Sequence, residues 1–323
     1  MKKRVIACLA MVLCVLLVLG ACAGGGGGGQ TTRLVMATGG TGGTYYPFGG
    51  ALAGVINANT DLQVSSTATG ASADNLRQIA AGDAHVAFAQ NDVSYYAFTA
   101  TEIWSEFEPI TGLRALMALH PEPVQIVVLD DSGIYSVADL AGRRVSIGDV
   151  GSGAAVNAGQ ILNAYGLSVN DISVFNLGAG PSADAIREGS IDAFFFTAIA
   201  PTAAIMELAL HRDIRLLSIS DERVAMLEAS YPFYAGKMLT SENYSFITTP
   251  VQTVTVHAQL VVLDTMDEEV AYEIVRAIME NKEAVVEGHR AGAYIEPVHS
   301  ATYVSIALHP GAERFFRELG VIG

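Results

Sequence analysis

Short apolar runs and amphipathic stretches alternate along most of this chain. Runs of apolar and β-branched residues bounded by Gly, Ser and Asn predict strands at 33–37, 62–66 and 84–89. The segments between them, 47–58 and 73–81, carry apolar residues at helical spacing and end near Asn or Gly. Strands and helices that alternate in this way are typical of α/β domains built on mostly parallel sheets.

The same order of elements recurs about 110 residues further along the chain. The second copy predicts strands and helices at 144–147, 154–164, 172–176, 183–188 and 191–196. Gly and Ser are common in turns everywhere, so a chance alignment is the alternative interpretation. Two related α/β units predict two lobes with a ligand cleft between them.

Two longer apolar segments are predicted to connect the lobes. The runs 113–119 and 124–129 flank His120-Pro121-Glu122-Pro123, which predicts a bent crossover, and 251–263 reads as the second crossing. We therefore expect hinges near 113–128 and 251–263. The predicted domains are lobe I, residues 31–123 plus 255–323, and lobe II, residues 124–254. An amphipathic helix is expected over 268–283.

Four glycine- and serine-rich loops precede predicted helices, and none of them contains Lys or Arg. They cover residues 38–44, 70–72, 148–153 and 179–182. In parallel sheets such loops lie at the carboxyl ends of the strands, where free N–H groups at helix starts can hold an anion. The loops therefore predict a carboxylate site made mainly by backbone groups, with Ser72 as the N-cap of its helix and Ser182 leading into the aligned helix of the second copy.

The overall charge excludes some partners. The formal net charge is −15, with 16% charged and 51% hydrophobic residues. This balance lacks the basic surface of nucleic-acid-binding proteins and disfavours general attraction to anionic lipids.

The first 30 residues read as a targeting and tethering segment. Lys2, Lys3 and Arg4 precede an uncharged apolar stretch, and Leu19-Gly20-Ala21-Cys22 resembles a bacterial lipobox. We expect residues 1–21 to be a signal peptide and residues 22–30 to be a lipidated Cys22 with a Gly-rich tether, so that the exported protein meets the membrane only through that lipid. A secretory peptide with a chance cysteine is the alternative. Cys22 would then be the one mature cysteine, which leaves no disulfide framework.

Motifs for catalysis and cofactors are incomplete. The loop from Gly39 lacks the third glycine of a dinucleotide motif, where Tyr45 stands instead, and the seven histidines show no metal-ligand spacing. We expect no cofactor, no metal and no catalytic residue. The alternative is an exported α/β enzyme with a dispersed active site, for example Asp92 or Glu122 with His120.

Several segments, in order, resemble a known receptor family. They are residues 39–47 (GGTGGTYYP), 90–96 (QNDVSYY), 121–127 (PEPVQIV), 151–153 (GSG), 192–197 (DAFFFT) and 308–312 (LHPGA). Together they resemble the TAXI-type solute receptors of TRAP transporters over nearly all of the mature chain. The resemblance implies a two-lobed, type II periplasmic-binding-protein fold that closes on a small carboxylate, glutamate- or glutamine-like or a C5 dicarboxylic acid. It also implies delivery of this ligand to an ion-driven TRAP permease, a monomeric receptor and no catalysis.

The residues expected to bind the ligand come from both predicted lobes. They are Thr41, Gly42, Gly43, Tyr45, Ser72, Gln90, Asn91, Gly151, Ser152, Gly153 and Thr197, with Tyr234 as a weaker candidate. Each has a plain structural alternative: the glycines serve tight turns, Ser72 only caps a helix, and the tyrosines pack in the core.

Overall fold

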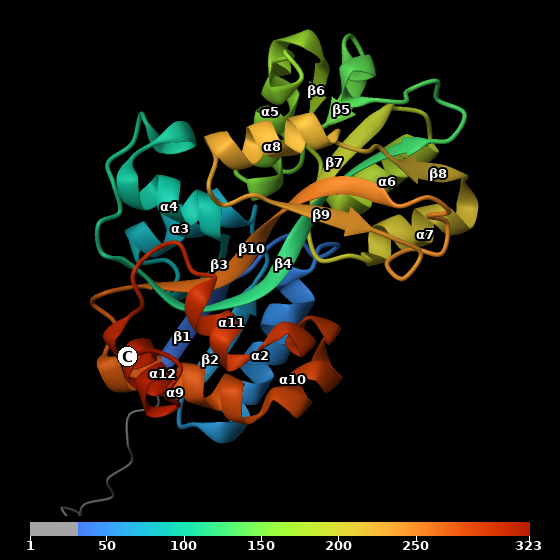
Figure 1. Cartoon of the computed structure of the whole chain (residues 1–323). Helices are drawn as coiled ribbons and strands as arrows, with labels where there is room; N and C mark the ends of the chain where they lie inside the picture. Colours follow the sequence, from blue (N-terminus) through green and yellow to red (C-terminus); the bar gives the residue numbers. More distant parts are fainter. Residues whose placement is uncertain (1–31) are drawn as a thin grey trace, which may run out of the picture. The chain divides into compact units, whose positions relative to one another are not determined.

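A computed structural model describes residues 32–323, of which Arg33–Gly323 form one compact unit. The unit is built on a ten-stranded mixed sheet with the strand order β2-β1-β3-β10-β4-β7-β5-β6, while β8 pairs with β4 and β9 with β10. Figure 1 shows how β4 and β10 run diagonally between the two groups of shorter strands. The expected signal peptide, tether and Cys22 lie outside the described residues.

The first α/β unit follows the predicted order closely. Its elements are β1 (Arg33–Ala37), α2 (Tyr45–Asn59), β2 (Gln63–Thr67), α3 (Ser72–Ala81), β3 (Val86–Gln90) and α4 (Asn91–Thr99). Strand β1 pairs in parallel with β2 on one side and with β3 on the other. The carboxyl ends of β1 and β3 therefore lie at one edge of the sheet, next to the helices that follow them.

The second unit repeats this topology. Its elements are β5 (Arg144–Ser146), α5 (Gly153–Ala164), β6 (Ser173–Phe175), α6 (Ala179–Arg187) and β7 (Ala193–Thr197). Strand β5 pairs in parallel with β6 and β7, as β1 does with β2 and β3. The alignment found in the sequence therefore reflects a real structural repeat. After it come α7 (Ala203–His211), β8 (Ile214–Leu216), α8 (Asp221–Ser230) and β9 (Ala235–Leu239).

Strands β4 (Leu113–Leu129) and β10 (Val251–Leu263) pair antiparallel. The two apolar runs of the predicted crossover belong to one strand, because Pro121 and Pro123 lie inside β4 and oppose His257 and Thr255 of β10. Proline is accepted here because the ladder to β7 begins only at Val124, so neither proline has to donate to a second strand. The ladder between β4 and β7 begins at Val124, which is also where lobe II was predicted to begin. The boundaries of the lobes stay a prediction.

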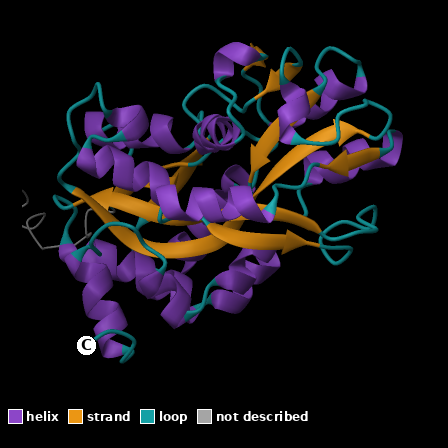
Figure 2. Ribbon diagram, turned by 45° about the horizontal axis from the view of Figure 1, so that its top comes forward, coloured by secondary structure: helices purple, strands orange, loops and turns teal. Residues whose placement is uncertain are grey.

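Helices cover both faces of the sheet (Figure 2). On the β1–β3 half, α2 packs with α9 (Glu268–Glu280), α10 (Lys282–Gly288) and α12 (Pro310–Glu318) in one apolar cluster that contains Phe48, Phe88 and Phe316. A second apolar cluster contains Trp104 and the buried apolar residues of α3 and α4. The short helix α11 (Pro297–Thr302) contacts β4. The predicted helix 268–283 ends earlier, because Asn281 leaves helical geometry and its side chain donates to the Ala277 carbonyl oxygen.

The predicted helix cap at Ser72 is wrong. Ser72 lies within α3, and its hydroxyl accepts from the Gln90 amide instead. Ser182 also lies inside its helix, α6, where its hydroxyl donates to Ser146 and to the Leu177 carbonyl oxygen. In both repeats the serine fixes a strand end to a helix rather than closing the helix terminus.

Among residues 32–323, no helix is both long enough and apolar enough to span a bilayer.

The contact between α9 and α12 gives a test of the packing. An ideal Cβ on Gly311 would lie 2.1 Å from the Glu268 carbonyl oxygen and 2.7 Å from the Tyr272 nitrogen. Gly311→Ala should therefore lower the free energy of unfolding by about 1–3 kcal/mol through overpacking. Gly54→Ala is the matched control, since its Cβ on α2 would meet nothing within 4 Å and should raise stability by about 0.5–1 kcal/mol. Urea denaturation measures both, and equal effects would contradict this packing.

Candidate functional site

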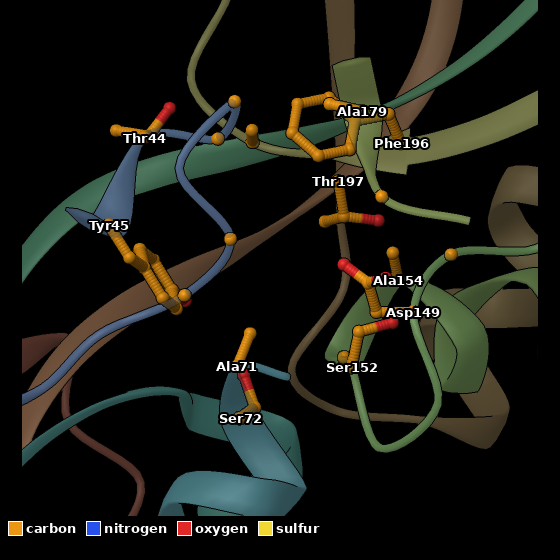
Figure 3. Close-up of a pocket in the computed structure, with 18 of the residues that line it drawn as sticks. Thr44, Tyr45, Ala71, Ser72, Asp149, Ser152, Ala154, Ala179, Phe196 and Thr197 are labelled. Atoms are coloured by element: carbon orange, nitrogen blue, oxygen red, sulfur yellow. The ribbon is translucent and has the colours of Figure 1, made fainter. Parts of the chain in front are cut away.

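The four glycine-rich loops surround a cavity of about 250 Å³. Figure 3 shows Tyr45 and Ser72 on one side of it and Asp149, Ser152 and Thr197 facing them. We call the residues from the β1–β3 side and β4 the first wall. They are Gly39, Gly40, Thr41, Gly42, Gly43, Thr44, Tyr45, Ala71, Ser72, Gln90 and Glu122. The second wall comprises Gly148, Asp149, Ser152, Gly153, Ala154, Gly178, Ala179, Gly180, Pro181, Phe196, Thr197 and Ala198.

The first wall combines a loop with unpaired backbone amides and a tyrosine that is held by buried contacts. Among the residues described, the amides of Thr41 and Gly42 donate no backbone hydrogen bond, whereas Gly43 donates to the Gly40 carbonyl oxygen at 2.9 Å. Tyr45 begins α2, and its hydroxyl donates to Glu122 Oε2 at 2.7 Å. Its ring lies 4.9 Å from that of Phe88, which holds the tyrosine in place. The loop is therefore free to offer N–H groups while the tyrosine is fixed.

The second wall is built from two helix starts and one strand end. Ser152 caps α5, because its hydroxyl accepts from the Ala155 amide at 3.1 Å. The start of α6 lies beside Gly42, where an ideal Cβ would come within 3.2 Å of the Gly180 nitrogen. Helix starts carry partial positive charge, so both favour an anion in the cavity.

Two buried side-chain atoms on the cavity lack a partner. Gln90 Oε1 and Thr197 Oγ1 make no hydrogen bond within the described chain, although these residues are only 2% and 7% exposed. Leaving a buried polar atom unpaired costs about 1–3 kcal/mol, and a ligand group that bonds to it recovers this energy. Both atoms thus point to a polar ligand.

Glu122 is a buried carboxyl on the cavity with a strongly raised pKa. Burial raises the pKa of Glu122 to about 8. The hydrogen bond from Tyr45 lowers this pKa, but by less than burial raises it. Burial likewise keeps His120 neutral, with its pKa lowered to about 3, so this histidine does not neutralise Glu122 as a cation. At pH 7 the Glu122 carboxyl is therefore protonated and can act as a hydrogen-bond donor.

The cavity contains acidic side chains and no basic ones. Its described lining holds Glu122 and Asp149 but no Lys, Arg or His. Partial burial raises the pKa of Asp149. No group of three His, Cys, Asp or Glu within residues 32–323 could hold a metal ion. A cationic group on a ligand would find its charge partner at Asp149, and an anionic group would find it at the helix starts.

The two walls touch each other beside the cavity. An ideal Cβ on Gly153 would lie 2.0 Å from Gln90 Oε1, so only glycine allows this approach. Nearby, the Gly151 carbonyl oxygen accepts from the amides of Ala73 and Asp74 at 2.9 and 3.3 Å. The expectation that the start of α3 offers free N–H groups is therefore wrong for these two amides, since the opposite loop already uses them.

Nine of the twelve residues predicted for the site line this cavity. The other three lie elsewhere. Asn91 accepts from the His257 amide at 3.1 Å, Gly151 caps α3 through its carbonyl oxygen, and Tyr234 is buried against α5. Whether any of the twelve binds a ligand stays a prediction.

Sequence reasoning did not place Glu122, Asp149 and Phe196 among the binding residues. Glu122 lies between two prolines, and its inward orientation follows from the register of β4 with β10. Asp149 belongs to a loop that was recognised for its glycines, so an acid in a glycine-rich loop was the available signal. The exposure of Phe196 to the cavity depends on where β7 ends and had no signal of its own.

The fold is that of the type II periplasmic solute-binding proteins. The alkanesulfonate-binding protein SsuA from Xanthomonas axonopodis pv. citri, bound to MOPS, is 18% identical, with a TM-score of 0.50 over 88% of this chain and 83% of its own. The binding component of a phosphonate ABC transporter from Pseudomonas aeruginosa is 11% identical, with a TM-score of 0.51 over 81% and 79%. A Xanthomonas citri protein bound to ATP is 11% identical, with a TM-score of 0.51 over 90% and 96%. The chain belongs to the NMT1-like family, which matches residues 36–320.

The buried carboxyl gives a pH prediction. A Glu side chain in an unfolded chain has a pKa of about 4.3. Between this pH and a pH of about 8, the folded protein therefore holds a proton on Glu122 that the unfolded chain lacks. Its contribution to the free energy of unfolding should fall as pH rises, by at most about 1.4 kcal/mol per pH unit. Glu122→Gln should remove this slope, so the stability difference between variant and parent should change between pH 6.5 and 8. Urea titrations measure it, and a constant difference would contradict a protonated Glu122.

Proposed function

We propose that this protein is an extracytoplasmic solute receptor that captures a small carboxylate in the cavity between the two walls and delivers it to a membrane permease. The observation that carries the proposal is the cavity itself, where two α/β repeats bring their helix starts and two unpartnered buried polar atoms together. Binding proteins commonly place ligands at such convergent strand ends.

The chemistry of the walls favours a ligand with both charges. Loop amides and the starts of α5 and α6 suit a carboxylate, while Asp149 suits an ammonium group. A dicarboxylate would bring a second negative charge beside Asp149, into a lining that has no basic side chain among the described residues. Within the expected ligand class we therefore favour glutamate- or glutamine-like amino acids over C5 dicarboxylic acids. The small cavity suits such compounds better than large cofactors.

The proposed transporter is of the TRAP type, driven by an ion gradient. Its support is the resemblance of the sequence motifs to TAXI-type receptors. A structural neighbour, the Pseudomonas aeruginosa protein, is by its description a component of an ABC transporter, so an ATP-driven permease is the second candidate. Uptake by the receptor with its permease in proteoliposomes separates the two, because one needs an imposed ion gradient and the other internal ATP.

The proposed location is outside the cytoplasm, at a bacterial membrane. The basic and apolar segment at residues 2–19 supports export, and Cys22 supports a lipid anchor. Globomycin-sensitive processing and labelling by a fatty-acid analogue that is lost in Cys22→Ser would support this assignment. An unlabelled secreted product would favour a plain signal peptide.

The proposed role needs no covalent step. An enzyme with Asp92 or Glu122 and His120 is the alternative. However, the His120 side chain is fully buried, and this burial lowers its pKa and keeps it neutral. Recovery of unchanged ligand after prolonged incubation distinguishes a receptor from a hydrolase.

The first test is a ligand screen. Amino acids and small carboxylates are added to the purified protein, and the shift in its melting temperature is measured. Calorimetry then measures the binding of the compounds that shift it. A receptor should be stabilised by about 2.7 kcal/mol at a ligand concentration of 100 Kd. L-Glutamate or L-glutamine should bind more tightly than glutarate. Tighter binding of glutarate would contradict the two-charge assignment, and silence across the panel would contradict the carboxylate class.

The contact of the two walls gives a second test. Gly153→Ala should lower ligand affinity by tenfold or more, because the added Cβ would force Gln90 away from α5. Gly159→Ala is the matched control in the same helix, since its Cβ would meet nothing within 4 Å and should leave affinity unchanged. Calorimetry with the best ligand of the screen measures both. Equal affinities would remove this contact from the binding mechanism.

A further inference from the structure

A buried hydrogen-bond network joins α4 to α5 behind the cavity. Asn157 Nδ2 of α5 donates to Asp92 Oδ2 of α4 at 2.9 Å and to the Tyr234 hydroxyl at 2.8 Å. The Tyr234 hydroxyl donates to Gln160 Oε1 at 2.6 Å, and Gln160 Nε2 donates to the Tyr96 hydroxyl at 3.1 Å. None of the five residues is more than 5% exposed. We call these five residues the α4–α5 network.

The network connects elements that belong to different repeats. Helix α4 follows β3 and packs against β3, α3 and β10, whereas α5 packs against β7 and α8. Asp92 and Asn157 are 65 positions apart in sequence, so the link is made only by the tertiary structure. A motion that separates α4 from α5 breaks the bonds of Asn157 to Asp92 and of Gln160 to Tyr96. Tyr234 bonds only to Asn157 and Gln160 of α5 and so holds these two side chains in place.

The network lies outside the cavity but is directly connected to it. None of its members lines the cavity. However, α5 begins at Gly153 and is capped by Ser152, and α4 begins immediately after Gln90, and these three residues do line it. A helix moves as a nearly rigid rod, so the bond at Asn157, one turn into α5, sets the position of the second wall.

The energy of the network depends on the walls being together. Asp92 is a buried acid whose carboxylate accepts hydrogen bonds from the Val93 amide and from Asn157 Nδ2. When the walls are apart, water can reach these polar groups, whereas when they meet each group must find its partner inside the protein. Losing the Tyr234 hydroxyl frees Asn157 and Gln160 to turn away from α4, which weakens the joined arrangement more than the separated one, where water can serve both side chains.

We propose that Asp92 and Asn157 are positioning residues that hold the two walls together without touching the ligand, and that Tyr234 orients Asn157 and Gln160 toward α4. The inference rests on the proposed receptor function and adds the element that governs its closure. It also gives Tyr234 a role different from the ligand contact expected from the sequence.

Hydrogen–deuterium exchange tests the inference without any ligand. The amides of Ala73 and Asp74 report on the junction, because they bond to the Gly151 carbonyl oxygen and contact no member of the network through a hydrogen bond. Tyr234→Phe should accelerate their exchange about tenfold, as expected for one lost hydrogen bond. Exchange in α9 should stay unchanged, because α9 belongs to the separate apolar cluster that contains Phe48, Phe88 and Phe316.

Tyr231→Phe is the matched control. Tyr231 packs against Tyr234 with ring centroids 6.0 Å apart, and its hydroxyl makes no side-chain hydrogen bond within residues 32–323. It should leave junction exchange unchanged. Unchanged exchange in Tyr234→Phe, or equal acceleration in α9, would overturn the inference, because the second result means only a general loss of stability.

Ligand kinetics provide the second readout. With the ligand of greatest thermal shift from the screen, stopped-flow measurements on Tyr234→Phe should show dissociation about tenfold faster and an association rate within about twofold of the parent. An equal change in both rates would overturn the positioning role. If no compound in the screen binds, the proposed function fails while the exchange experiment still decides the inference.

Discussion

The antiparallel pairing of β4 with β10 is the constraint on which the rest of the structure depends. These strands carry the sheet from one α/β repeat to the other, since β10 pairs with β3 and β4 pairs with β7. Their register decides which residues face inward where the two repeats meet. In this register Glu122 lies opposite Val256 and lines the cavity, and the two flanking prolines fit because that part of β4 has one neighbouring strand.

The cavity shows how a strongly acidic protein can offer a place for an anion. The general field of a chain with a net charge of −15 repels anions, and the described lining has no basic side chain. Attraction therefore has to come from nearby dipoles, which loop amides and helix starts supply over short distances. The protonated state of Glu122 follows the same logic, because burial away from cations removes one negative charge from the site.

Three contacts join the segments on the two sides of the cavity. Gly151 bonds to the start of α3, Gly153 approaches Gln90, and Asn157 bonds to Asp92. Each depends on a different property of the chain, namely a carbonyl oxygen, a missing side chain and a buried amide. Such contacts are individually modest, about 1 kcal/mol each. Their sum is smaller than the energy of a large apolar interface, which suits the opening and closing that the proposed receptor function requires.

The sequence by itself determined the local elements, the repeat and the loops of the site. Apolar periodicity located both α/β units, and glycine-rich segments identified the four loops that meet at the cavity, because these features depend on neighbouring residues. Only the tertiary structure decided that the Pro-Glu-Pro segment continues as a strand, that Ser72 bonds to Gln90, and that Tyr234 joins α5. These outcomes depend on partners far away in the chain, such as Val256 opposite Glu122 and Asn157 beside Tyr234. Strand register and burial set those partnerships, and no local pattern of residues encodes them.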